Sequence, residues 1–323
     1  MLRKIDWESQ IGRRMRLRDL YVFSTVARLG SMAKAARQLG VSQPAVSEVI
    51  ADLEYALGVR LLDRKRQGVE PTAYGVALER RSLAAFDELR QSIRDIEFLA
   101  DPSVGELRIG CPESISAAIV QPILDQFSQE YPRVVLDVDT VNTLSFAQKL
   151  RERNLDLVLA RGGWPLEEPQ LVTDLNIETL LDDELVVVAG RHSPWARRRK
   201  IDIAELREER WILTRSDMWN YQIIDRAFRL RGVEMPKIAI KTISVHLRAG
   251  MAATGRFITT FPRSVLALHA DRFGLKALPV ELPRHGWPIK VATLKHRTQS
   301  PVVDRFIACA RAVVKSLTGR KRS

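Results

Sequence analysis

A cluster of four residues near the N-terminus combines polar side chains with a proline: Gln43, Pro44, Ser47 and Glu48. Their amide, hydroxyl and carboxylate groups can donate or accept hydrogen bonds. Proline suits the first turn of a helix, because no backbone N–H is needed there. At the N-terminal end of a helix, such groups can reach base edges in a DNA groove. The spacing therefore indicates a DNA-recognition helix, with Gln43, Pro44 and Ser47 at bases or groove edges.

Two predicted helices joined by a tight turn position these side chains. Ser31 and Ser42 are good N-caps, because a serine hydroxyl can accept a hydrogen bond from an unpaired backbone N–H. Gly40 can adopt the positive φ that ends the first helix. The second helix has one apolar stripe, formed by Val46, Val49, Ile50 and Leu53. The pattern predicts a helix-turn-helix, although an ordinary helical hairpin would look similar.

A strand, a basic turn and a second strand are predicted over residues 61–72. Three consecutive cations, Arg64, Lys65 and Arg66, occupy the tip of this hairpin. The hairpin is typical of a winged helix-turn-helix, whose wing contacts backbone phosphates. We expect these cations, with Ser31 and Met32, to contact the DNA backbone or the minor groove. The alternative for the three cations is a solvated turn.

The same residues resemble the LysR-type transcriptional regulators. The matching positions are Ser31–Ala36, Leu39–Ser47, Ile50, Leu53–Glu54, Leu57–Val59, Leu61, Arg64 and Pro71–Gly75. Two positions depart from the family pattern: Glu48 stands where a cation or an amide is frequent, and Leu62 where phenylalanine is usual. Leu62 keeps the position apolar, whereas Glu48 could repel a phosphate or accept a hydrogen bond from cytosine. The resemblance spans nearly the whole chain and is sharper before residue 76 than after it.

The charge balance fits an anionic partner. The 323 residues include 51 Lys and Arg against 39 Asp and Glu, a net charge of +12. Residues 1–75 carry 13 against 8, a net charge of +5. Charge alone does not separate nucleic acid from a membrane surface, but no stretch approaches the roughly 20 apolar residues that cross a bilayer. The N-terminus lacks the apolar core of a signal peptide, so we expect a cytoplasmic protein with no membrane partner.

No constellation of residues supports catalysis. The five histidines are scattered without metal-ligand spacing, and the chain has neither a P-loop nor a GxSxG motif. Cys111 and Cys309 are far apart in sequence, which favours buried inert thiols over the alternative of a redox-switch pair. We therefore expect no enzyme, no metal and no cofactor.

A long helix is predicted after the hairpin, because residues 76–101 contain no Gly or Pro. Its apolar residues step by three or four positions, the seam spacing of a coiled coil: Phe86, Leu89, Ile93, Ile96 and Ala100. A paired helix would place two recognition helices about one DNA turn, or a multiple of it, apart and so read a palindrome. The resemblance implies dimers formed through this helix, and often tetramers. The alternative is a single helix packed on its own domain.

The second half alternates strands and helices, which predicts an open, mostly parallel sheet. The first predicted elements are 107–110, 134–138 and 155–159 as strands, with 115–130 and 144–153 as helices. The resemblance implies a periplasmic-binding-protein-like effector domain with two α/β lobes crossed twice by the chain, near 183–189 and 286–293. The fold class is thus an α/β effector domain joined by a linker helix to a winged helix-turn-helix. The expected bounds are 1–72 for the DNA-binding domain (1–15 an extension), 73–102 for the linker, 103–183 with 287–318 for lobe I, 184–286 for lobe II, and 319–323 for a basic tail.

Ligands of such sheets bind beyond the carboxyl ends of the strands, so the loops there are candidate contacts. The resemblance places Ser114, Thr143 and Arg161 where family members contact an inducer. Thr214, Arg215, Arg256 and Phe257 come from two further loops predicted to end strands. Converging guanidinium groups would favour a carboxylate or phosphate. In the alternative, the arginines pair with Glu113, Asp174 or Asp217, and Ser114 and Thr143 are plain helix caps.

These patterns predict a ligand-responsive transcription regulator. Its expected partners are double-stranded DNA, a small effector such as a carboxylate or sugar acid, and further copies of the chain in a homodimer or homotetramer. RNA polymerase is an additional candidate partner. A solute-binding or enzymatic α/β protein with a helical dimerisation domain, and an architectural DNA-coating protein, are the rival hypotheses.

Overall fold

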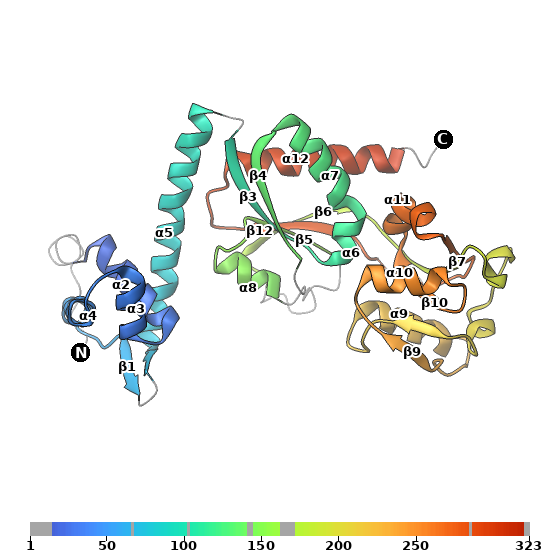
Figure 1. Ribbon diagram of the computed structural model, residues 1–323, viewed down its shortest axis with the longest axis horizontal. Helices are drawn as coiled ribbons and strands as arrows, with labels where there is room; N and C mark the ends of the chain where they lie inside the picture. The colour runs from blue at the N-terminus through green and yellow to red at the C-terminus, as the bar shows by residue number, and fades with distance from the viewer. Residues whose placement is uncertain are drawn as a thin grey trace. The chain divides into compact units, whose positions relative to one another are not determined.

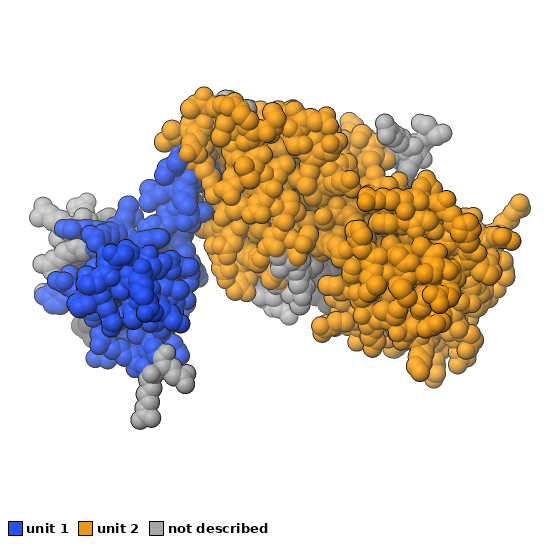
Figure 2. Space-filling model, viewed as in Figure 1, with its two compact units in different colours: residues 1–93 blue, residues 94–323 orange. Residues whose placement is uncertain are grey.

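The computed structural model describes residues 15–65, 68–101, 104–140, 145–161, 172–283 and 286–319. The chain divides into two compact units, residues 1–93 and 94–323, which Figure 2 shows in different colours. The boundary falls inside the long helix α5 (Ala73–Ala100) and not at its start, where the sequence had suggested a domain boundary. The predicted domain bounds stay a prediction.

The described residues of the N-terminal unit form three helices and a two-stranded hairpin before α5 (Figure 1). These elements are α2 (Leu17–Leu29), α3 (Met32–Leu39), α4 (Gln43–Leu57), β1 (Leu62–Lys65) and β2 (Gly68–Pro71). Their shared core contains Phe23, Val26 and Leu53, each 0% exposed. These elements confirm the predicted helix-turn-helix and the predicted hairpin of the wing. The prediction succeeded because the local cap and turn signals agree with the apolar pattern.

The predicted caps form as expected. Ser31 Oγ accepts a hydrogen bond from the N–H of Lys34, and Ser42 Oγ from that of Ala45, each at 3.3 Å. Gly40 ends α3 with φ of 65°. This left-handed conformation favours glycine and turns the chain into α4.

The start of α5 contacts the residues that immediately precede β1. Thr72 Oγ1 donates to the carbonyl of Arg60 at 2.7 Å and accepts the N–H of Gly75 at 3.1 Å. A Cβ at Gly75 would lie 2.1 Å from the carbonyl oxygen of Leu61. The close approach of α5 to the hairpin therefore requires glycine at position 75.

The described residues of the C-terminal unit form two five-stranded sheets. The first has the strand order β4-β3-β5-β12-β6, in which β3 pairs in parallel with β4 and β5, and β12 runs antiparallel to β5 and β6. Its strands are β3 (Val104–Gly110), β4 (Arg133–Asp139), β5 (Leu157–Arg161), β6 (Leu175–Leu181) and β12 (Ile289–Leu294). On one face lie α7 (Gln121–Glu130) and α12 (Pro301–Gly319), and on the other α8 (Phe146–Arg151) (Figure 1).

The second sheet has the order β11-β7-β10-β8-β9. Its strands are β7 (Leu185–Gly190), β8 (Trp211–Leu213), β9 (Ile238–Lys241), β10 (Ile258–Pro262) and β11 (Leu275–Ala277). One face packs on α10 (Val245–Ala253) and α11 (Arg263–Phe273), and the other on α9 (Trp219–Arg229) with two short 3-10 turns, η5 (Pro194–Arg197) and η6 (Ile203–Leu206). We call the regions of the first and second sheets lobe I and lobe II. The chain crosses between them after β6 and again after β11.

The helix predicted over 115–130 is interrupted by a wider turn. The structure has α6 (Glu113–Ile115), a π-helical turn η2 (Ser116–Val120), and then α7. Pro122 explains the change, because proline has no N–H to donate and its ring clashes with the carbonyl four residues earlier. Widening the turn to π geometry removes that clash.

Buried apolar side chains of both lobes form one continuous cluster. Lobe I contributes residues such as Leu107 and Phe127, and lobe II contributes Val188, Val245 and Phe261, all 0% exposed. The lobes are therefore joined by a shared hydrophobic core as well as by the two crossings. Within the described ranges, no helix is both long and apolar enough to span a membrane.

A buried carboxylate holds part of lobe I together. Asp156 Oδ1 lies 2.8 Å from Arg108 Nη2 and 2.9 Å from Arg297 Nη2, and Asp156 Oδ2 accepts the N–H of Arg108. Burial alone would raise the pKa of Asp156, but its hydrogen bonds to Arg108 and the charges of Arg108 and Arg297 hold the pKa below its usual value. The carboxylate is therefore ionised in the folded protein near neutral pH.

In Asp156→Asn, we expect the free energy of unfolding of the C-terminal unit to depend less strongly on pH in the acidic range. The ionised carboxylate stabilises the fold fully above its unfolded pKa of about 3.9, and this contribution is lost as the pH falls through the lower folded pKa. Urea unfolding at a series of acidic pH values measures the slope, and five of the six tryptophans lie in residues 94–323 and report it. Asp271→Asn, at a fully exposed carboxylate, is the matched control. An equal pH dependence of the free energy of unfolding in the two variants would contradict this role of the Asp156 carboxylate.

Candidate functional site

The polar tip of α4 is presented as the sequence predicted. Gln43, Pro44 and Glu48 are exposed in its first turns, Ser47 is half-buried, and Ser42 caps the helix. The opposite face of α4 is anchored in the core by Val46 and Ile50. A helix held in this way can enter a DNA major groove with its N-terminal end.

The predicted backbone contacts lie on neighbouring elements. Ser31 and Met32 are half-buried at the start of α3, and Arg64 and Lys65 are exposed on β1. Lys65 forms an ion pair with Glu70 across the hairpin, and this hydrogen bond raises the pKa of Lys65. Arg66, predicted at the hairpin tip, lies outside the described residues.

Glu54 positions the wing, although the sequence analysis assigned it no role of its own. Its Oε1 accepts the N–H of Leu61 at 2.7 Å and that of Leu62 at 3.1 Å. The carboxylate thereby ties the C-terminal half of α4 to the first strand of the wing. The sequence placed Glu54 only in the family pattern, because its partners lie beyond the end of its own helix.

Glu54→Ala is expected to lower the free energy of unfolding of the N-terminal unit by about 2 kcal/mol, since two backbone donors lose a charged acceptor. Glu54→Gln keeps one acceptor oxygen and should cost less. Hydrogen exchange at the amides of Leu61 and Leu62 measures the effect directly. Unchanged protection of both amides in Glu54→Ala would rule out this bracing contact.

The predicted dimer seam on α5 is only partly available. Phe86 packs edge-on against Tyr21 of α2, with ring centroids 5.8 Å apart, and so belongs to the core of its own unit. For Phe86, the alternative of a helix packed on its own domain applies. Leu89, Ile93 and Ile96 are 46%, 58% and 67% exposed, which leaves an apolar strip for pairing.

Arg161 is buried and already has a partner. Its Nη1 lies 2.6 Å from Asp183 Oδ2, its Nη2 donates to Ser264 Oγ at 3.2 Å, and its guanidinium lies 4.8 Å from the ring centroid of Trp287. Burial lowers the pKa of Arg161, and the charge of Asp183 opposes that shift. Arg161 thus joins residues from both crossings and from lobe II. The alternative, a pairing with Glu113, Asp174 or Asp217, does not occur at this arginine, whose partner is Asp183.

Three of the other predicted effector residues, Ser114, Thr214 and Arg215, come within a few residues after a strand. Ser114 lies in α6, whose N-cap is Pro112, so Ser114 is not a helix cap. Thr214 follows β8 and donates to Asn220 Oδ1 at 2.5 Å, while the exposed Arg215 pairs with Asp217 at 3.4 Å, as the alternative predicted. Thr143 lies outside the described residues.

Arg256 and Phe257 precede a strand and do not follow one, so the prediction that their loop ends a strand is wrong. They precede β10, which runs parallel to β8 with Ile258 beside Trp211, whereas Thr214 follows the far end of β8. Phe257 is buried, with Arg210 stacked 4.6 Å from its ring centroid. The sequence pattern showed a loop next to a strand but not which end of the strand it joined.

Arg248 is a buried cation that the sequence search missed. Its side chain donates to the carbonyl of Thr260 at 2.9 Å and lies over the ring of Phe261, but no carboxylate of the described residues forms an ion pair with it. Its Nε and the hydroxyl of Thr260 are buried without hydrogen-bond partners. Burial lowers the pKa of Arg248 to about 10, against the opposing charge of Glu113. An uncompensated buried charge of this kind favours an anionic ligand.

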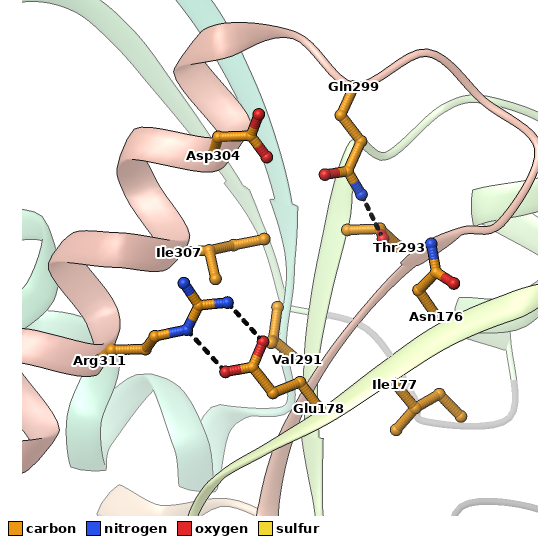
Figure 3. A pocket seen from close by; sticks show the side chains of 9 residues that line it. All are labelled: Asn176, Ile177, Glu178, Val291, Thr293, Gln299, Asp304, Ile307 and Arg311. Carbon is orange, nitrogen blue, oxygen red and sulfur yellow. Dashed lines mark hydrogen bonds and ion pairs between the residues drawn. The ribbon is translucent and has the colours of Figure 1, made fainter.

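A polar cavity of about 490 Å³ lies between α12 and the edge of the first sheet (Figure 3). Arg311 and Glu178 form a two-point ion pair inside it, with N–O distances of 2.7 and 2.6 Å. The hydrogen bonds from Arg311 lower the pKa of Glu178. The two charges neutralise each other, so the cavity does not call for a charged ligand.

The two cysteines are both buried. Burial raises the pKa of the Cys111 thiol to about 12 and also raises that of Cys309. Such thiols stay protonated and poorly reactive near neutral pH, which agrees with the expectation of inert thiols. Among the described residues, no group of three His, Cys, Asp or Glu side chains could hold a metal ion.

Comparison with known proteins identifies the class. Residues 17–76 match the model for the bacterial regulatory helix-turn-helix protein of the lysR family, and residues 100–315 match the LysR substrate binding domain. The chain belongs to the LysR family. It is a DNA-binding transcriptional regulator with a substrate-binding domain, and its relatives are regulators rather than enzymes.

Individual relatives are distant. The transcriptional regulator TdcA of Escherichia coli is 28% identical over 75% of this chain and 76% of its own. The RuBisCO operon transcriptional regulator of Allochromatium vinosum is 32% identical over 67% of this chain and 69% of its own. Among solved structures, ArgP from Mycobacterium tuberculosis has a TM-score of 0.65 at 20% identity, covering 92% of this chain and 96% of that one. Full-length CbnR complexed with its target DNA has a TM-score of 0.61 at 23% identity, covering 93% and 100%. These structural similarities show the fold.

Proposed function

We propose that this regulator binds an interrupted palindrome as a dimer or tetramer, with the first turn of α4 from each copy in a major groove. The supporting observation is the capped end of α4, where Gln43, Pro44 and Glu48 are exposed. Leu89, Ile93 and Ile96 offer an apolar strip for self-pairing. RNA polymerase, which a regulator meets at a promoter, is a proposed further partner.

Binding to labelled DNA from upstream of its own gene tests the assignment of α4. Ser47→Ala should weaken specific binding by about 1–3 kcal/mol and leave binding to bulk DNA unchanged. Arg64→Ala should weaken binding to both and reduce the salt slope by about one. Ser128→Ala, an exposed serine on α7, is the control. Specific binding that survives in both test variants would exclude these contacts.

We further propose that lobes I and II sense a small anionic metabolite, such as a carboxylate or sugar acid. Arg248 supports an anion, because its buried charge lacks an acidic partner among the described residues, and it lies on α10 one turn from Val245. The N–H of Val245 donates to Glu113 of lobe I at 3.1 Å, which places this end of α10 at the junction of the lobes. Arg161 is neutralised by Asp183 and would order the crossings instead.

A thermal-shift screen with carboxylates and sugar acids, repeated on Arg248→Met, tests this proposal. Removing a buried charge that lacks an ion pair should leave the melting temperature of the free protein unchanged or higher. The shift caused by the active acid should disappear in the variant. A ligand shift of full size in Arg248→Met would remove Arg248 from the effector site.

A further inference from the structure

The side chains of helix α4 include no cation. Its 15 residues contain the acids Glu48, Asp52 and Glu54 but neither lysine nor arginine. Glu54 is used inside the unit, where its carboxylate accepts the N–H groups of Leu61 and Leu62. Cationic contacts to DNA phosphates must therefore come from other elements, because an acidic side chain repels a phosphate. The two remaining acids of α4 need another explanation.

Glu48 lies on the outward face of α4. With 3.6 residues in each helical turn, its position is roughly opposite the buried residues Val46 and Ile50. Pro44, about one turn earlier, and Ala51, about one turn later, are exposed on the same face. Both of these side chains are shorter than that of glutamate. The carboxylate of Glu48 can therefore reach beyond its neighbours towards a surface that meets this face.

Glu48 has no partner among the described residues of its own chain. It forms no ion pair or hydrogen bond with them. Asp52, four residues further on, is a second exposed carboxylate, and like charges at this spacing slightly destabilise a helix. The helix dipole stabilises an acid in the first turn, but Glu48 lies beyond that turn. The fold gains no stabilising contact from this carboxylate within the described residues, so we expect its partner outside the chain.

A carboxylate in the major groove selects a base edge that donates a hydrogen bond, because both of its oxygens only accept. Guanine presents two acceptors there, N7 and O6, and thymine presents the acceptor O4 beside a methyl group. Adenine has a donor at N6, but its acceptor N7 lies next to that donor and repels a carboxylate. Cytosine presents the N4 amino group without a neighbouring acceptor. Cytosine is therefore the base that a carboxylate prefers.

We propose that Glu48 determines the sequence specificity of this regulator by accepting a hydrogen bond from the N4 amino group of one cytosine in each half-site. This inference rests on the proposed placement of the first turns of α4 in a major groove. The same carboxylate repels phosphates of any sequence, so it weakens binding to DNA that lacks the cytosine. Glu48 thus increases specificity both by attracting one base and by penalising other sites.

Selection of bound sequences from random duplex DNA by the full-length protein is the first test. The wild type should enrich a C·G pair at one fixed position of each half-site. Replacing that cytosine by N4-methylcytosine, which blocks the donor in the groove but keeps the base pair, should weaken wild-type binding at least about tenfold. The same replacement should have little effect on Glu48→Ala, which has no carboxylate to accept the hydrogen bond.

Glu48→Gln is the second test, because it keeps the size of the side chain and removes the charge. This variant should bind the selected operator at least about tenfold more weakly, enrich adenine in place of the cytosine, and bind bulk DNA more tightly. A misfolded variant would not bind bulk DNA more tightly.

Asp52→Asn is the matched control, since it removes one exposed negative charge from the same helix. It should strengthen binding to bulk DNA but leave the preference for cytosine at the Glu48 position unchanged. If the wild type selected no sequence, the proposed function would fail and this inference with it. If the wild type selected a palindrome but showed no cytosine preference, or if Glu48→Gln kept that preference, only the inference about Glu48 would be overturned.

Discussion

Replacing Asp183 by alanine is expected to lower the free energy of unfolding of the C-terminal unit by about 3–5 kcal/mol, since it leaves the buried guanidinium of Arg161 without its counter-charge. The side chains of Arg161 and Asp183 are 5% and 3% exposed. Asp183 Oδ1 also accepts the N–H groups of Glu184 and Ser264, at 2.9 and 3.1 Å. Urea unfolding followed by tryptophan fluorescence measures the loss, and Trp287 lies directly over Arg161.

The matched control for this prediction is Asp174→Ala. Asp174 forms an equally close pair with Arg151, at 2.7 Å, but both side chains are more than a third exposed. Solvent-exposed pairs contribute only about 0–1 kcal/mol. Replacing both members of the buried pair, in Arg161→Met with Asp183→Leu, should recover much of the lost stability. A cost for Asp183→Ala no larger than that for Asp174→Ala would show that burial does not strengthen this pair.

Gly75→Ala is expected to destabilise the N-terminal unit by about 3 kcal/mol and to abolish specific DNA binding. The added Cβ would lie 2.1 Å from the carbonyl oxygen of Leu61, a backbone atom that accepts the N–H of Thr72 and cannot rotate away. Either the start of α5 or the wing must move, at a cost in the upper part of the range for overpacking. Fluorescence anisotropy with labelled DNA measures binding, and hydrogen exchange around Phe23 measures the stability of the unit.

Gly250→Ala is the control for the glycine variant. Gly250 also lies within a helix, α10, but nothing is within 4 Å of a Cβ built there. Alanine should be neutral or stabilise that helix by up to about 1 kcal/mol. If Gly75→Ala kept both full DNA binding and wild-type exchange, the close approach of α5 to Leu61 would not constrain the fold.

The sequence predicted the N-terminal unit well because its signals are local. The cap hydrogen bonds of Ser31 and Ser42 reach three residues along the chain, and Gly40 acts at its own position. Glu54 was missed as a brace, since the N–H groups that it binds are seven and eight residues away in another element.

The effector unit was predicted less completely because its side chains meet partners far away in sequence. Arg161 contacts Asp183 and Ser264, 22 and 103 residues away, so no local spacing indicates that its charge is already neutralised. The position of Arg256 depended on the direction of β10, which is set by pairing with β7 and β8. The sequence analysis did not identify β6 or α11.

The apolar cluster that runs through both lobes limits how this sensor can move. Opening the two lobes would expose side chains such as Val188 and Phe261 to water. This exposure would cost a free energy of about 25 cal/mol for each Å² of apolar surface. Sliding of packed helices by an ångström or two keeps those side chains dry. The conformational change caused by an effector should therefore be a small sliding movement of α10 and α11. Solution scattering profiles of the protein with and without effector should be nearly superimposable.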